Sequence, residues 1–169
     1  MTGIMPNEEN KIFRSEEFNE TETPLEKIVE YRDIRGSYPI SYMQAFVVTS
    51  QANVGIGDGK YFFHVDKNTA NKNLVEVHAE VLTAGTTNTT DIQIANVTQS
   101  ADMLTTKITI DSAETGSDTG TAAVIDPLND DVAENDLLRI DVDAVSTTPP
   151  KGLIITLGFA SLGQNLRKQ

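Results

Sequence analysis

One short segment carries the side-chain types that most often do acid–base or metal chemistry. Glu76-Val77-His78-Ala79-Glu80 alternates charged or imidazole side chains with apolar ones. On a strand, this alternation puts both carboxylates and the imidazole on one face, where they could ligate a metal or act as an acid and a base. Residues two apart on a strand are separated by about 7 Å, however, and a tetrahedral metal site needs further ligands that the sequence does not supply. We therefore expect a solvated polar face.

Acidic residues also cluster at positions 126–131, in the sequence Asp-Pro-Leu-Asn-Asp-Asp. Oxygen ligands of this kind suit calcium, but the segment lacks the spacing and the closing glutamate of an EF-hand. Asp-Pro followed by Asn-Asp-Asp is also common in turns. Asp141 and Asp143 make no stronger case for calcium. We expect a turn at 126–131 and no metal site.

Two further patterns would serve phosphate binding or nucleophilic catalysis. Residues 55–59 hold three glycines, but a strand-like run follows them, whereas a phosphate cradle needs a helix N-terminus at that point. We expect a hairpin-type turn there. None of the serines at positions 100, 112, 117, 146 and 161 lies in a G-x-S-x-G setting or near a histidine in the sequence. The sequence thus predicts no catalytic residues and no cofactor, and we expect the protein not to be an enzyme.

Composition narrows the function classes further. The chain has 169 residues, with 25 acidic against 13 basic side chains, a net charge of −12 and no cysteine. An acidic surface argues against nucleic-acid binding and against docking on an anionic membrane, because both need lysine and arginine. No apolar stretch approaches the roughly 18 residues of a membrane span. The lack of cysteine excludes disulfides, thiolate zinc sites and thiol nucleophiles.

From Ile40 onward, apolar residues recur with the period of two that is typical of half-buried antiparallel strands. Weaker strand patterns lie at 45–49, 60–65 and 91–96, and glycine- and threonine-rich turn clusters separate the segments. This spacing predicts an all-β protein, an antiparallel β-sandwich of jelly-roll or Greek-key type. The four clearest inward rows are Val75, Val77, Ala79 and Val81; Leu104, Thr106, Ile108 and Ile110; Leu138, Ile140, Val142 and Ala144; and Leu153, Ile155, Leu157 and Phe159.

The chain divides into three parts. Residues 1–39 have little periodic apolar sequence, so we expect an extended N-terminal arm. Thr23-Pro24-Leu25-Glu26 is a capping box, and Gly36 offers a stop, which predicts one short helix near residues 24–34. Residues 40–160 form the sandwich domain. Residues 161–169 form a C-terminal tail with Arg167 and Lys168 and no acid, which is either solvated or in contact with an acidic patch of the capsid.

Several phrases in the sandwich region resemble a module that is common in structural proteins of tailed bacteriophages. They are GDGKYF at 57–62, NLVEV at 73–77, AGTTNTTDIQIANVT at 84–98, DMLTTK at 102–107 and DVDAVSTTPPKGL at 141–153. In proteins that look like this, the module is a jelly-roll sandwich in capsid decoration (cement) proteins, head fibres and some tail-associated proteins. The resemblance therefore implies a non-enzymatic virion component, usually a homotrimer.

Among these possibilities, we favour a decoration protein on the outer capsid surface, with the major capsid protein and further copies of itself as partners. The alternatives are a tail, baseplate or head-fibre protein with a host-adhesion role, and a carbohydrate-binding module. An arm gains its stability from the surface that it crosses, so we expect residues 1–39 to clip neighbouring capsid subunits. The expected capsid-contact residues are Ile4, Ile12, Phe13, Phe18, Leu25, Ile28 and Val29.

Overall fold

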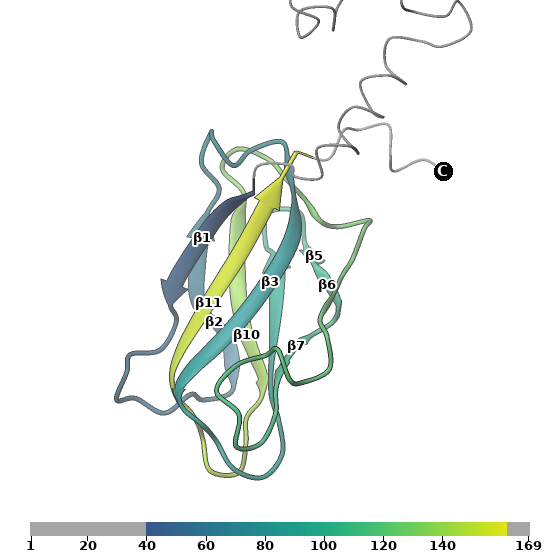
Figure 1. The fold of residues 1–169 in the computed structure, drawn as a ribbon. Coiled ribbons are helices and arrows are strands. Elements are labelled where there is room, and N and C mark those ends of the chain that lie inside the picture. Colours follow the sequence, from purple (N-terminus) through teal and green to yellow (C-terminus); the bar gives the residue numbers. More distant parts are fainter. Residues whose placement is uncertain (1–39, 162–169) are drawn as a thin grey trace, which may run out of the picture. The chain divides into compact units, whose positions relative to one another are not determined.

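The computed structural model describes residues 40–161, which are drawn in colour in Figure 1. The predicted arm over residues 1–39, its helix near 24–34 and the tail from residue 162 lie outside the described residues. Within 40–161, all regular secondary structure is β, and all paired strands run antiparallel. The predicted all-β, antiparallel class is confirmed.

The strands form two main sheets and one small one. The first sheet has the order β1-β11-β3-β9, made of β1 (Ser41–Phe46), β11 (Lys151–Ala160), β3 (Lys72–Thr83) and β9 (Asp131–Val132). The second has the order β2-β10-β4-β5, made of β2 (Gly57–His64), β10 (Leu137–Ala144), β4 (Thr90–Asn96) and β5 (Ala101–Asp102), with β7 (Ile108–Ile110) also paired to β4. The short strands β6 (Leu104–Thr106) and β8 (Val124–Ile125) pair with each other.

One apolar core collects side chains from both main sheets, an arrangement consistent with a β-sandwich. Figure 1 shows β1, β11 and β3 side by side, with β2 and β10 behind them. The row predicted on β11 is confirmed, because Leu153, Ile155, Leu157 and Phe159 are all fully buried. Burial of one such side chain contributes about 1.5–3 kcal/mol. The row on β10 is confirmed from Leu138 to Val142, and Ala144 is half-buried.

The row predicted on β3 is correct only in its second half. Ala79 and Val81 are buried, whereas Val75 and Val77 are half-buried. The register of β3 against β11 shifts between Gly158 and Phe159, so that Leu74 rather than Val75 lies opposite Phe159. This β-bulge gives β3 one extra residue and moves the inward position by one.

The predicted strand over residues 104–110 was wrong as a single element. It is broken at Lys107 into β6 and β7, which pair with β8 and β4 respectively. Leu104, Ile108 and Ile110 are still buried, because the alternation resumes after the break. The first strand also lies earlier than predicted, at Ser41–Phe46 instead of 45–49.

The hairpin expected at residues 55–59 is absent. β1 ends before this segment and β2 begins within it, and the two strands belong to different sheets, so the chain passes from one sheet to the other here. Gly57 and Gly59 lie inside β2 with φ values of 141° and 67°, a region that favours glycine. Their unusual backbone accompanies a register shift between β2 and β10.

Candidate functional site

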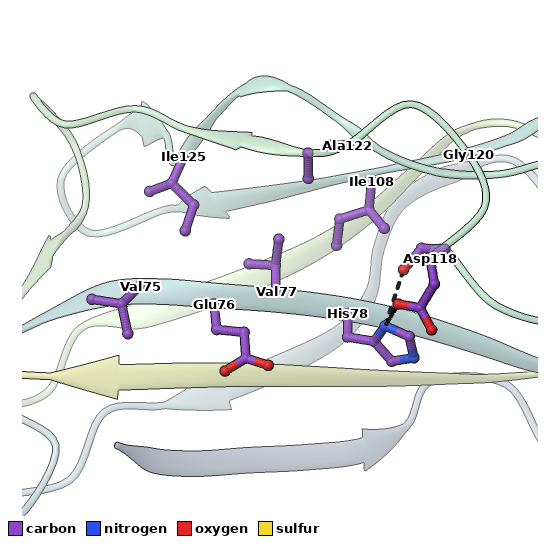
Figure 2. A pocket seen from close by; sticks show the side chains of 11 residues that line it. Val75, Glu76, Val77, His78, Ile108, Asp118, Gly120, Ala122 and Ile125 are labelled. Atoms are coloured by element: carbon purple, nitrogen blue, oxygen red, sulfur yellow. Dashed lines mark hydrogen bonds and ion pairs between the residues drawn. The ribbon is translucent and has the colours of Figure 1, made fainter. Parts of the chain in front are cut away.

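A groove of about 370 Å³ lies beside β3. Figure 2 shows β3 along one side and the segment around residues 117–125 along the other. Val77, Ile108, Ala122 and Ile125 contribute apolar side chains to it, and Ile125 and Ala122 reach toward β3 from the opposite side. Glu76 and Asp118 are its acidic lining residues, but the carboxylate of Glu76 points away from the groove, over β11 toward Tyr42. No lysine or arginine among residues 40–161 lines the groove. The groove therefore combines an apolar floor with an acidic rim at Asp118.

The groove exists because the edge of β3 that faces away from β11 is paired with other backbone segments near both of its ends but not between them. At one end, β9 pairs with Lys72 and Asn73. At the other, the backbone of Ser117 donates to the carbonyl of Ala79 at 3.0 Å, and the amide of Val81 donates to the carbonyl of Thr115 at 2.8 Å. Val77 lies between these two coverings.

Strand geometry fixes where the backbone of Val77 points. The amides of Ala79 and Val81 point away from β11, and antiparallel strands alternate the direction of their backbone groups. The N–H and C=O of Val77 therefore also point away from β11, toward the groove. Within residues 40–161, these two groups have no backbone partner on that side. Among the described residues, a short stretch of sheet edge is thus left uncovered at the groove.

His78 closes one end of the groove and holds the neighbouring loop. Its Nδ1 lies 3.2 Å from Ser117 Oγ and 3.1 Å from Asp118 Oδ1, and its Nε2 lies 3.4 Å from Glu80 Oε1. The expectation that Glu76, His78 and Glu80 share the outer face of one strand agrees with this placement. Ser117 and Asp118 were missed, because only the fold brings a turn thirty-nine residues away against β3.

The contacts of Ser117 favour a structural role over a nucleophilic one. Ser117 Oγ accepts a hydrogen bond from the amide of Ala79 at 3.1 Å, in addition to its contact with His78. Asp118 competes for the same imidazole nitrogen. A serine nucleophile needs a base that is free to take its proton, and here that nitrogen is shared. The arrangement instead fixes the 115–118 segment to β3.

The outer face of the β1-β11-β3 sheet presents a second feature, a set of exposed apolar side chains. We call it the aromatic face and define it by Ile40, Tyr42, Phe46 and Leu82, with half-buried Ile154 between β1 and β3. Tyr42 is 56% exposed and Phe46 is 58% exposed. Large aromatic side chains left open to water are typical of surfaces that bind another protein.

Polar contacts order this face from strand to strand. The hydroxyl of Tyr42 donates to Glu76 Oε2 at 2.8 Å, and Gln44 Nε2 donates to Thr156 Oγ1 at 2.9 Å. The hydrogen bond to Glu76 and the negative charge of that carboxylate raise the pKa of Tyr42 above its ordinary value, and partial desolvation acts in the same direction. The tyrosine is therefore held in a defined position although it is exposed.

The remaining acidic candidates have local structural partners. Asp126 accepts from the amide of Leu128 at 3.0 Å and from Asn129 Nδ2 at 2.7 Å, as expected for a turn. Asp141 accepts from Arg139 Nη2 at 2.8 Å and from the amide of Gly59 at 2.7 Å.

Asp143 pairs with Lys107 Nζ at 2.8 Å, and this hydrogen bond raises the pKa of Lys107. Among residues 40–161, no group of three or more histidine and acidic side chains is arranged to hold a metal ion.

The seven expected capsid-contact residues, from Ile4 to Val29, all lie outside the described residues. The described part of the chain contains no helix long and apolar enough to cross a membrane. Comparison with known proteins gave no match to the chain among family models, curated proteins or solved structures.

Proposed function

We propose that this chain is a structural virion protein of a tailed bacteriophage, a capsid decoration protein that binds the outer capsid surface as a homotrimer and stabilises the shell. The observation that carries the proposal is the aromatic face. Tyr42 and Phe46 are exposed on β1, the strand that follows the arm directly in the sequence, and Ile40 is exposed just before it. An arm and an apolar face that are continuous in the chain can grip one partner together, and each then raises the avidity of the other.

The strand order supports the finer part of the fold proposal, a jelly roll. The first strand pairs with the last, and the second pairs with the next to last, so that the sheets read β1-β11-β3-β9 and β2-β10-β4-β5. A chain that folds back on itself in this way alternates between two sheets, as jelly rolls do. The resemblance of residues 57–159 to phage structural modules points in the same direction.

The charge of the domain suits an outer surface. Residues 40–161 hold 16 acidic and six basic side chains, a difference of −10. Such a surface repels nucleic acid and other acidic particles, and it favours virions that remain dispersed. We propose the major capsid protein as the main partner, and neither nucleic acid nor membrane. The proposed role is structural and not enzymatic, which the shared contacts of Ser117 and His78 support.

The copy number of the protein in purified virions tests this proposal. A ratio to the major capsid protein near one, or a fixed large fraction of it, is expected for a protein spread over the capsid lattice. Quantitative mass spectrometry of intact particles, with a tail protein of known stoichiometry as the internal standard, measures the ratio. A few to a few dozen copies would contradict decoration and would indicate a tail, baseplate or head-fibre protein instead.

A further inference from the structure

The groove beside β3 has the features of a site for a short extended peptide. It offers an open stretch of sheet edge at Val77, an apolar floor that includes Ile108 and Ile125, and an acidic rim. When a peptide adds to a sheet as a strand, the open edge supplies backbone hydrogen bonds and the apolar floor supplies pockets for its side chains. The acidic rim selects for a peptide with positive charge.

The acidic character continues past the groove. A second hollow shares the lining residue Asp118 with the groove and adds Glu80 and Glu114. No lysine or arginine in residues 40–161 lines either hollow. A ligand that fits both the floor and the rim has an aliphatic side chain followed by cationic ones.

We propose that the C-terminal tail of the same chain, residues 162–169, occupies this groove. The tail reads Leu-Gly-Gln-Asn-Leu-Arg-Lys-Gln, so Leu166 is followed directly by Arg167 and Lys168. Leu166 fills the apolar floor, and the two cations lie beside Asp118 at the rim and the carboxylates of Glu80 and Glu114 in the second hollow. This assignment does not depend on the proposed virion function, because the isolated chain contains both parts.

The place where the last strand ends makes the contact possible. Ala160, the last residue of β11, pairs with Asn73 on β3, and the groove begins two residues further along β3, at Val75. Crossing β3 and running to Val77 requires about 15–20 Å, from a spacing of about 4.8 Å between strands and about 3.3 Å per residue. The six residues from Ala160 to Leu166 span about 20 Å when extended. The tail is long enough, with little slack.

Engineered cysteines test the contact cleanly because the native chain has none. The variant Ala122→Cys with Gln169→Cys places one thiol in the groove and one at the end of the tail. The matched control is Ala133→Cys with Gln169→Cys. Ala133 is exposed and follows β9, which pairs with the start of β3, so the control thiol lies near the end of β11 but outside the groove.

Under mild oxidation of the full chain, we expect an intramolecular disulfide between positions 122 and 169 to form about tenfold faster than one between 133 and 169. The charge reversal Arg167→Glu with Lys168→Glu should remove this advantage and leave the control pair unchanged. Equal rates for the two pairs, or no effect of charge reversal on the 122–169 pair, would show the proposal to be wrong. Disulfides that join two chains would overturn it as well.

A second measurement needs no cysteine. In the full chain, charge reversal at Arg167 and Lys168 should shift the amide NMR signals of Val77 and Ile125, and the signal of Tyr61 on β2 should stay in place. Unchanged signals at both groove positions would contradict the proposal even where the Ala122→Cys variant failed to fold. Neither measurement involves capsids, so failure here is distinct from failure of the proposed function.

Discussion

The hydroxyl of Tyr42 reaches across β11 to Glu76, and Gly158 lies between them. Tyr42 and Glu76 are both paired with Gly158 in register, and the oxygen–oxygen distance is 2.8 Å. A Cβ atom at position 158 would lie 3.0 Å from Glu76 Cβ and 3.1 Å from Tyr42 Cε1. The absence of a side chain at 158 thus leaves room for the tyrosine ring to reach Glu76 across the middle strand.

Replacing Glu76 by Gln should lower the pKa of Tyr42 toward its ordinary value. The hydrogen bond to the carboxylate and its negative charge both oppose formation of the phenolate, and Gln removes the charge. Spectrophotometric titration of the four tyrosines measures the change. Glu80→Gln, two residues along the same face, is the control and should leave the titration unaltered. An identical titration of the Glu76→Gln variant and the native protein would contradict this contact.

Asp136 should contribute to stability in a pH-dependent way. Burial acts to raise its pKa, but hydrogen bonds from the amide of Ala133, from Asn96 and from Gln99 outweigh burial and hold the pKa below 3.8. A lowered pKa means that the stabilisation is complete above the unfolded value, and that it is lost as the pH falls through the folded value. Asp136→Ala leaves buried donors unpaired and should cost about 1–3 kcal/mol at neutral pH.

Urea unfolding at neutral pH and at about pH 3 checks both parts of this prediction. The difference between native protein and Asp136→Ala should shrink in acid, because there the unfolded chain binds a proton at Asp136 more readily than the folded domain does. Glu134→Ala, a change at an exposed neighbour, is the control and should cost little at either pH. A difference that grows in acid would show that the sign is wrong.

Ser117→Ala should loosen the 115–118 segment without unfolding the domain. The substitution removes the acceptor for the amide of Ala79 and the contact with His78, at a cost of about 1 kcal/mol. Hydrogen exchange at the amide of Ala79 should become faster, and exchange at Ile155, in the core, should keep its rate. Thr121→Ala, at an exposed position in the same loop, serves as the control. Unchanged exchange at Ala79 would mean that Ser117 does not hold this edge.

The aromatic face should be required for capsid binding but not for folding. Tyr42→Ser with Phe46→Ser removes two exposed rings, so the free energy of unfolding should change little while co-sedimentation with undecorated capsids falls at least about tenfold. Leu128→Ser removes a side chain that is 84% exposed but lies outside this face. That control should bind capsids normally, and equal binding by both variants would exclude the aromatic face as the contact.

The arm makes a separate contribution in this proposal. A chain that lacks residues 1–39 should bind capsids more weakly than the full chain, because the expected anchors from Ile4 to Val29 are lost. The same co-sedimentation assay measures the difference. Binding as tight as that of the full chain would show that residues 1–39 do not grip the capsid.

The local sequence pattern was sufficient to predict burial where a strand lies in the two-sheet core without irregularity. The alternation from Leu153 to Phe159 predicted a buried row correctly, because a strand inside a two-sheet core must alternate. Pattern failed at Val75, since a bulge depends on the partner strand as well as on β3. It failed at Lys107 for a related reason. The apolar period continues through the break, and only the choice of pairing partners divides β6 from β7.

The candidate site was less accessible to sequence reasoning than the fold. Alternation along one strand was enough to place Glu76, His78 and Glu80 on one face. The sequence around Ser117 and Asp118 showed only the pattern of an ordinary turn. Their place beside His78 follows from the bridge between Gly116 and Glu80, a contact that no local signal marks. The open edge at Val77 was equally hidden, since it depends on where two other segments stop covering β3.

The pairing of the first strand with the last has a mechanical consequence. Ser41 lies opposite Phe159, so the chain enters and leaves the domain side by side. Tension applied between the two ends of the domain would separate β1 from β11 one pair of backbone hydrogen bonds at a time, because these hydrogen bonds lie along the direction of the force. Tension applied along a single long strand would instead act on all of its interstrand hydrogen bonds at once. The domain therefore opens at a smaller force when it is pulled by its N- and C-terminal strands than when it is pulled along one strand.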